Sequence, residues 1–352
     1  MDWFATRLLK WYAAHGRSHL PWLKDKTPYR VWLSEVMLQQ TQAATVIPYF
    51  ERMLARFPDL PSLADATQDE VLALWTGLGY YARGRNLHRA AQIIVEQYNG
   101  HFPDQLSALM DLPGVGQSTA GAILASGFDK RGVINDANVK RVLARFHIVK
   151  GHVTTSKTSK QLWSLADKHT PNKHFANYNQ AIMDLGASLC GRKTLCQQCP
   201  LVTKCEAHKA DCVVNFPQKK KAKIKTTRQV RIFVINNQLQ QLYLEKQPAK
   251  GVWGGLWSPP IRPRNCTTTH FLDELNVSPP ELVSQTIMPQ FRHTFSHYHL
   301  EIEPVLINLD QTGSISEDRS EQPTTWYNVH NNSALGLSAV AVKLIQQFKD
   351  SI

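Results

Sequence analysis

Apolar residues recur at helical spacing through the first 211 residues of this chain. In each such stretch they lie three or four positions apart, which places them on one face of a helix. Thr27 and Pro28 add a start signal, since threonine caps helices and proline suits the first helical position. We therefore expect an all-helical domain. The stretches with this pattern are 29–42, 47–57, 69–75, 86–98 and 138–146.

The pattern changes after Cys212, where apolar and polar residues begin to alternate, as in β-strands. No acidic residue occurs between Cys212 and Leu244, and basic residues crowd the first half of that interval. We expect a helical domain at 1–212, a basic linker at 213–228 and an α+β domain at 229–352. The expected strands are 230–237, 239–246, 297–309 and 324–329, followed by a closing helix at 337–350. The basic residues are Lys219, Lys220, Lys221, Lys223, Lys225, Arg228 and Arg231.

Length and charge narrow the classes of function. At 352 residues the chain is longer than a typical single domain, and its apolar fraction of 43% is ordinary for a folded protein. No apolar run reaches the roughly eighteen residues of a membrane span. The N-terminal residues have charges among their apolar positions, unlike a signal peptide, so we expect a cytoplasmic protein, nucleoid-associated if bacterial. The formal net charge of +12 favours a polyanionic partner, most simply nucleic acid.

The segment 112–120 (LPGVGQSTA) predicts a tight turn between two helices. Pro113 should end a helix over 104–112, and Gly114 and Gly116 permit backbone conformations that a Cβ would penalise. A second helix should begin at Gln117 or Ser118. Such a turn presents free N–H groups and a helix N-terminus, which suit a phosphate oxygen. A Gly-x-Gly turn alone is equally typical of an ordinary helix–helix connection.

Four of the six cysteines form the pattern C-x5-C-x2-C-x5-C. Zinc fingers typically have two C-x2-C pairs, and only one such pair occurs here. The spacing therefore favours a 4Fe–4S cluster, which would hold a rigid loop that presents positive charge to phosphates. The four cysteines are Cys190, Cys196, Cys199 and Cys205.

Two carboxyl groups stand out as possible catalysts. Glu35 lies on a mostly apolar helix face, where desolvation disfavours its charged form and suits a general acid. Asp136 precedes an apolar-faced helix and is equally typical of an N-cap. Together, one proton donor and one anion are what cleavage of a glycosidic bond requires.

Seven segments, in this order, resemble the MutY-type adenine DNA glycosylases of the helix-hairpin-helix superfamily. They are SEVMLQQTQ, WTGLGYYARGRNL, LPGVGQSTAGAIL, DANVKRVLARF, NQAIMDLGA, the four-cysteine loop and FRHTFSHYHLEI. The resemblance covers nearly the whole chain and is weakest across 261–285 and 310–322. It implies a six-helix barrel domain, a domain with one 4Fe–4S cluster, and a C-terminal Nudix-like domain that reads 8-oxoguanine.

The resemblance also implies residue roles in base excision repair by a monomer on double-stranded DNA with adenine opposite 8-oxoguanine or guanine. Glu35 would protonate adenine, Asp136 would stabilise the sugar cation, and Asn138 would lie beside the reacting sugar. Trp22 would line the base pocket, and Gln40 and Tyr80 would enter the base stack. The implied DNA contacts elsewhere are Gly114, Val115, Gly116, Ser118, Ser296 and His297.

Two departures from the family pattern occur. The family commonly has glycine where this chain has Ala137, which suggests ordinary helical geometry there. The gap between Cys190 and Cys196 is one residue shorter than usual, which concerns the path of the loop.

Three other readings are open from the sequence. An endonuclease III-type glycosylase and lyase acts on oxidised pyrimidines, but that group has a lysine where this chain has Ser118, and a hydroxyl cannot form a Schiff base. A Nudix hydrolase needs a helix of clustered glutamates, and only scattered acids occur. A non-catalytic DNA-binding module would make Glu35 and Asp136 incidental. We also place His293, His297 and His299 on one face of a strand, which indicates a polar, DNA-facing surface or a metal site.

Overall fold

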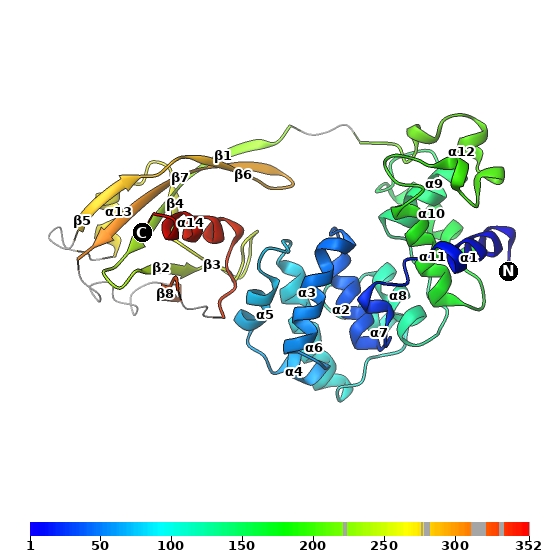
Figure 1. Cartoon of the computed structure of the whole chain (residues 1–352), viewed down its shortest axis with the longest axis horizontal. Helices are drawn as coiled ribbons and strands as arrows, with labels where there is room; N and C mark the ends of the chain where they lie inside the picture. Colours follow the sequence, from blue (N-terminus) through cyan, green and yellow to red (C-terminus); the bar gives the residue numbers. More distant parts are fainter. Residues whose placement is uncertain (221–223, 276, 278–281, 311–321, 331–333, 352) are drawn as a thin grey trace. The chain divides into compact units, whose positions relative to one another are not determined.

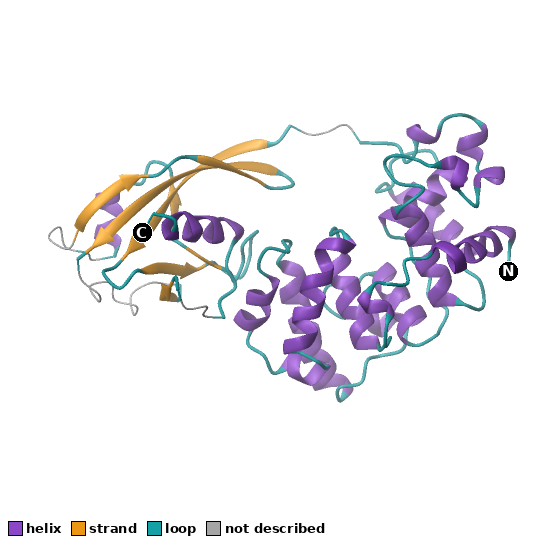
Figure 2. Ribbon diagram, viewed as in Figure 1, coloured by secondary structure: helices purple, strands orange, loops and turns teal. Residues whose placement is uncertain are grey.

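A computed structural model of the chain describes residues 1–220, 224–275, 277, 282–310, 322–330 and 334–351. By its internal contacts the chain divides into two compact units (Figures 1 and 2). The first comprises Met1–Asp65 and Asn86–Ala222, and the second Ala66–Arg85 and Lys223–Ile352. Lys221 and Lys223 of the predicted linker lie outside the described residues. In the part of the chain that is described, no helix has the length and apolar character to cross a membrane.

The first unit is helical, as the apolar spacing predicts. Side-chain caps begin several of its helices: Thr27 accepts a hydrogen bond from the N–H of Arg30, and Asp59 from that of Ser62. Its α-helices are α1 (Trp3–His15), α2 (Pro28–Leu38), α3 (Ala43–Arg56), α4 (Leu60–Ala64), α6 (Ala82–Tyr98, from Asn86 onward), α7 (Leu106–Met110), α8 (Gln117–Gly127), α9 (Ala137–Phe146), α10 (Ser156–His169), α11 (Phe175–Ala187) and α12 (Glu206–Lys209). Short 3₁₀ helices lie at Pro21–Leu23, Cys196–Gln198, Val202–Lys204 and Val213–Asn215.

One predicted helix is shorter than expected. The sequence indicates a helix over 104–112, but α7 begins only at Leu106 and ends at Met110. Asp104 instead pairs with Lys130 through its side chain. The carbonyl oxygen of Asp104 also accepts a hydrogen bond from Nζ of Lys130 at 3.3 Å. A contact distant in the chain, which apolar spacing does not report, thus occupies a group that a helix would use.

Helices α9 and α11 pack against each other, and α11 also contacts α1 and α8. The buried core around them is built from side chains such as Leu143, Leu162, Tyr178 and Leu185. Partly buried Cys190, Cys199 and Cys205 pack against the same core. The helix that carries Asp136 at its start and the cysteine loop are therefore supported by one packed body.

A close backbone crossing fixes the segment that leads to Asp136. A Cβ added to Gly121 on α8 would overlap the carbonyl oxygen of Val133. We expect Gly121→Ala to lower the free energy of unfolding by about 1–3 kcal/mol, because the backbones would have to separate. Thermal unfolding measures this. Gly191→Ala is the control, since its Cβ would lie no closer than 3.4 Å to a neighbouring atom, and equal destabilisation by both variants would contradict the prediction.

The second unit is built on a mixed β-sheet. Its strands run in the order β3-β2-β1-β7-β5, with β4, β6 and β8 paired to β1, β7 and β2. The long strands β1 and β7 are parallel, and Thr226 pairs with Tyr298. The strands are β1 (Thr226–Asn236), β2 (Gln241–Lys246), β3 (Trp257–Ser258), β4 (Ile261–Pro263), β5 (Leu282–Ile287), β6 (Phe291–Thr294), β7 (Tyr298–Leu309) and β8 (Thr324–Asn328).

Alternation along β1 builds a core on each side of the sheet. Ile232 and Val234 pack with α14 (Ala339–Lys349), whereas Phe233 and Ile235 pack with α13 (Thr268–Glu274). Four consecutive apolar residues, 232–235, are therefore buried in β1, so this strand is covered on both faces and lacks the apolar–polar alternation expected from the sequence. The fold class is the one the sequence predicts, a helical domain followed by an α+β domain.

The segment Ala66–Arg85, which carries Tyr80, packs with the sheet. It contains α5 (Gln68–Trp75), where Asp69 pairs with Lys246 at 2.8 Å. Arg85 donates to the carbonyl oxygen of Gly254 at 2.6 Å. These polar contacts hold the segment against β2 and the loop that follows it.

Candidate active site

The turn at 112–116 has the features expected of a phosphate-binding hairpin. Gly114 has a φ of +78°, which favours glycine, whereas Gly116 has an ordinary φ of −88°. Gly116 is instead the N-cap of α8, and nothing lies within 4 Å of where its Cβ would be. The Val115 side chain is buried, so the turn presents its backbone outward. Gln39 at the end of α2 donates to the carbonyl oxygen of Gly114 at 3.2 Å, which ties the turn to that helix.

Glu35 lies in the last two turns of α2, between the buried residues Ser34 and Val36. Burial, and after it the nearby charge of Asp136, together raise the pKa of its carboxyl group from 4.5 to about 8. At neutral pH the group therefore holds a proton and can give it up.

Asp136 is the N-cap of α9, as one reading of the sequence predicts. Its Oδ1 accepts a hydrogen bond from the N–H of Val139 at 2.9 Å, and its Oδ2 accepts one from Nδ2 of Asn138 at 3.1 Å. Capping and catalysis do not exclude each other here, because the charge of Asp136 also acts on Glu35. The structure thus brings the two predicted carboxyl groups into one electrostatic site.

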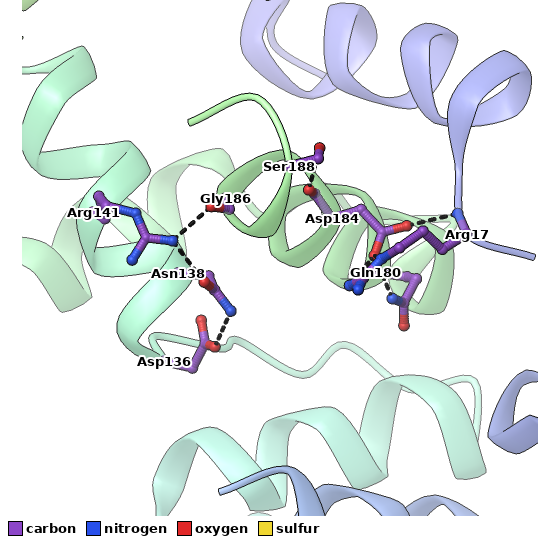
Figure 3. Close-up of polar contacts among 8 residues, drawn as sticks. All are labelled: Arg17, Asp136, Asn138, Arg141, Gln180, Asp184, Gly186 and Ser188. Atoms are coloured by element: carbon purple, nitrogen blue, oxygen red, sulfur yellow. Dashed lines mark hydrogen bonds and ion pairs between the residues drawn. The ribbon is translucent and has the colours of Figure 1, made fainter. Parts of the chain in front are cut away.

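Asn138 is held in turn by Arg141 (Figure 3). The Arg141 guanidinium donates to Oδ1 of Asn138 at 2.7 Å, to the carbonyl oxygen of Gly186 at 2.6 Å and to that of Cys190 at 2.8 Å. A Cβ on Gly186 would lie 2.7 Å from the Cβ of Asn138, so glycine lets α11 approach α9 at this point. The orientation of Asn138, and through it that of Asp136, is therefore fixed by three separate segments.

Loss of this arginine should be costly. We expect Arg141→Met to lower the free energy of unfolding by at least about 2 kcal/mol, since even one hydrogen bond from a charged donor is worth about 1.5–3 kcal/mol. Thermal unfolding measures this effect. Lys160→Met on the exposed face of α10 is the control, and a stability equal to that of the control would contradict this account.

A second buried carboxylate supports α11. Asp184 accepts hydrogen bonds from the backbone N–H of Arg17 at 2.9 Å, from its guanidinium at 2.8 Å and from Gln180 at 2.7 Å (Figure 3). Its own carbonyl oxygen accepts a bond from the Ser188 hydroxyl at 2.7 Å. A buried carboxylate with charged and polar partners anchors the chain after α1 to α11, which carries Gly186.

Sequence reasoning did not identify Arg141 or Asp184. For Asp184, the available signal was an aspartate inside the apolar run NQAIMDLGA. For Arg141, the signal was weaker: it lies three residues after Asn138, a spacing that allows side-chain contact on a helix.

The other predicted DNA-contacting residues lie at exposed or strained positions. Gln40 and Tyr80 have φ values of 59° and 48°, which non-glycine residues rarely adopt, and Tyr80 is 49% exposed. Such strain is often kept at functional sites. Ser118 accepts a hydrogen bond from the N–H of Asn135 at 3.0 Å. Trp22 is buried against Phe50 in a 3₁₀ helix that packs on α2.

The four predicted cluster cysteines are free thiols close enough to influence one another. Burial, and after it the charges of the other three, raise the pKa of the Cys199 thiol to about 12. Arg145, buried on α9, donates to the Sγ of Cys190 at 3.3 Å. Among the described residues, no group of three His, Cys, Asp or Glu side chains is arranged to hold a single metal ion. Four cysteine thiols, one of them hydrogen-bonded to a buried guanidinium, match the donor set that a 4Fe–4S cluster takes.

The histidines of HTFSHYH do not share one strand face, which corrects the sequence-based placement. His293 pairs with Leu300, and Thr294 pairs with His299, so His293 and His299 point to opposite faces of a hairpin formed by β6 and β7. His297 lies at the exposed tip between the strands, next to Ser296, whose Oγ is 3.2 Å from Nδ1 of His297. The reversal at 295–298 interrupts the alternation that a single strand would have.

Comparisons with known proteins agree with this geometry. The family model of the HhH-GPD superfamily of base excision DNA repair proteins matches residues 33–168, and a NUDIX domain model matches residues 231–347. A thermostable thymine-DNA glycosylase has a similar structure, with a TM-score of 0.54, 25% identity, and coverage of 59% of this chain and 95% of that one. A non-covalent endonuclease III–DNA complex has a TM-score of 0.50 at 21% identity, covers 59% of this chain and 94% of that one, and supports the fold.

The fold and the paired carboxyl groups therefore define a base-excision DNA glycosylase, an enzyme that cleaves N-glycosidic bonds in DNA. Full-length relatives narrow the class. The adenine DNA glycosylase of Buchnera aphidicola subsp. Schizaphis graminum is 39% identical over 98% of this chain and 99% of its own length. That of Buchnera aphidicola subsp. Acyrthosiphon pisum is 38% identical over 99% and 98%. The chain belongs to the adenine DNA glycosylase family.

Proposed function

We propose that this enzyme is a monofunctional glycosylase that excises adenine paired with 8-oxoguanine, and with guanine, from double-stranded DNA. The observation that carries the proposal is Glu35, which holds a proton at neutral pH beside Asp136. Departure of adenine needs a proton donor for the base and an anion for the sugar cation. The two carboxyl groups supply one of each.

The chemistry follows from their placement. Glu35 gives its proton to a ring nitrogen of adenine, the bond between base and sugar breaks, and its electron pair leaves with the base. Asp136 stabilises the cation that forms at the sugar, and Asn138 holds Asp136 in place from beside the sugar. Water then adds to the cationic carbon and loses a proton, which leaves an abasic site.

The base must leave the duplex before it can react. Unstacking costs a few kcal/mol and is cheapest at a mispair. We infer that Gln40 and Tyr80 enter the stack from their exposed turns and that Trp22 lines the base pocket. The backbone of Gly114, Val115 and Gly116, with Ser118 at the start of α8, would bind phosphate.

We further infer that Ser296 and His297, at the exposed tip of the β6–β7 hairpin, contact 8-oxoguanine. The catalytic part would comprise 1–212, joined by the linker 213–228 to a reading domain at 229–352, and the enzyme would act as a monomer on DNA in the cytoplasm.

The cofactor we propose is one 4Fe–4S cluster on the four cysteines, Cys190, Cys196, Cys199 and Cys205. The cluster would hold the loop rigid, so that the loop presents its positive charge to phosphates. Purified protein should contain about four iron and four acid-labile sulfide per chain, as a 4Fe–4S cluster has. Cys199→Ser should lose most of this iron, whereas Cys212→Ser, outside the set, should keep it. Iron content unchanged in Cys199→Ser would contradict the assignment.

Single-turnover adenine release tests the proposed activity. Duplexes should carry adenine opposite 8-oxoguanine, guanine or thymine, and strand breaks should be scored before and after alkali. We expect release mainly opposite 8-oxoguanine, with breaks only after alkali, because Ser118 cannot form a Schiff base. Breaks without alkali, or activity on oxidised pyrimidines instead, would favour an endonuclease III-type enzyme. DNA binding without base release would favour a non-catalytic module.

A further inference from the structure

The basic stretch that the sequence presents as a tether ends against the hairpin tip. Lys225 lies just before β1 and donates from Nζ to the carbonyl oxygen of Phe295 at 2.7 Å. Arg228, three residues on, lies over the ring of Tyr298 at 4.7 Å. Phe295 and Tyr298 are the two ends of the turn, joined by a hydrogen bond from the N–H of Phe295 to the carbonyl oxygen of Tyr298 at 2.9 Å.

Parallel pairing of β1 with β7 explains why both residues reach the turn. Thr226 pairs with Tyr298, so Lys225 and Arg228 flank the position where β7 leaves the turn. Lys225 precedes Thr226 in the chain and Arg228 follows it, so the two basic residues lie on opposite sides of the Thr226–Tyr298 pair along the direction of β1. The register of β1 on β7 therefore fixes the positions of Lys225 and Arg228 at the 295–298 turn.

Aromatic rings complete the support. The ring of Trp253 lies 5.2 Å from that of Phe295, and the ring of Phe295 lies 4.6 Å from that of Tyr298. The ring of His297 lies 4.8 Å from that of Tyr298. The two exposed residues of the tip, Ser296 and His297, therefore lie between Phe295 and Tyr298, whose rings pack together. Lys225 contacts the first of these aromatic residues and Arg228 the second.

We propose that Lys225 and Arg228 are positioning residues for recognition of 8-oxoguanine, which hold the 295–298 turn in the shape that presents Ser296 and His297. This inference rests on the proposed function. Polar groups that are held in one arrangement can distinguish 8-oxoguanine from guanine. A loose turn would hold neither base in a fixed geometry and would therefore lose the distinction. A positioning role predicts loss of selectivity, whereas a simple phosphate contact predicts weaker binding to every duplex.

The test measures single-turnover adenine release and duplex affinity for adenine opposite 8-oxoguanine and opposite guanine. In Lys225→Met we expect the selectivity for 8-oxoguanine to fall about tenfold, a typical cost of a lost hydrogen bond from a charged group. In Arg228→Met we expect a fall of roughly two- to tenfold, since a cation–π contact is worth less. Lys225→Arg and Arg228→Lys, which keep a donor or a cation at the same site, should restore most of it. Lys219→Met is the matched control, since it removes the same charge from the part of the linker that belongs to the first compact unit, and it should leave selectivity unchanged.

Each result decides the matter. If both methionine variants lose affinity equally for the two duplexes, with the salt dependence changed as in Lys219→Met, the residues only contact phosphate and the inference is wrong. Unchanged selectivity in the variants would also overturn it while leaving the proposed function intact. A native enzyme without any preference for 8-oxoguanine would overturn both.

Discussion

Asp136→Asn should reduce adenine release by about 10²–10³-fold while leaving the fold intact, because removal of one preorganised group at a developing charge has this size of effect. Asparagine is as good an N-cap as aspartate, so α9 should still begin at residue 137. What is lost is the negative charge that faces the sugar cation. The change thus separates the two roles of Asp136, capping and catalysis.

The measurement is single-turnover base release, with thermal unfolding and duplex affinity measured in parallel. Asp136→Ala is the matched variant, since it removes both the charge and the cap and should also cost about 1 kcal/mol of stability. Asparagine variants that release adenine at the native rate would leave Asp136 as a cap alone and would favour the non-catalytic binding module.

Glu35→Gln should have an effect of similar size, about 10²–10⁴-fold on base release, because glutamine cannot give a proton to adenine. The pH profile is diagnostic. Native activity should be level on the acid side of neutrality and fall as the pH rises through about 8, where Glu35 loses its proton. The residual activity of the glutamine variant should show no such fall. An alkaline limb of the same midpoint in the variant would assign that titration to another group.

The raised pKa of Glu35 also predicts how the free energy of unfolding depends on pH. The folded pKa of Glu35 lies above its unfolded value of 4.5, so its contribution to stability is fully present below about 4.5 and is lost as the pH rises through about 8. Between these values the free energy of unfolding should fall by about 1.4 kcal/mol per pH unit relative to Glu35→Gln. Denaturant titrations of both proteins at several pH values measure the difference, and parallel curves would contradict the burial of Glu35.

Much of the fold followed from local patterns. The helical spacing and the caps at Thr27 and Asp136 each depend on near neighbours in the chain, and each is found in the structure. The strand at 230–237 is also found, but its apolar residues are consecutive and buried on both faces. The helix at 104–112 and the shared face of the three histidines were wrong for the same reason. Apolar periodicity does not report a turn or a competing side-chain partner, such as the reversal after Thr294 or the pairing of Asp104 with Lys130.

The candidate active site could be predicted from the sequence only in part. Glu35 and Asp136 could be named because one lies on an apolar face and the other precedes a helix, but each had an ordinary structural explanation. Their mutual influence across a hundred residues depends on how α2 and α9 come together. Arg141 was missed because its partners, Gly186 and Cys190, are more than forty residues away in the chain.

The sequence by itself determined the order of elements, the class of each domain and the kinds of side chain available for chemistry, since these depend on spacing and residue type. Only the tertiary structure decided which of them meet. It raised the pKa of one carboxyl group through burial beside another, joined Asn138 to the cysteine loop through one guanidinium, and brought Lys225 to the carbonyl of Phe295 through strand register. Electrostatic coupling and hydrogen bonding act over a few ångströms of space, and no local pattern along the chain specifies which distant residues will share that space.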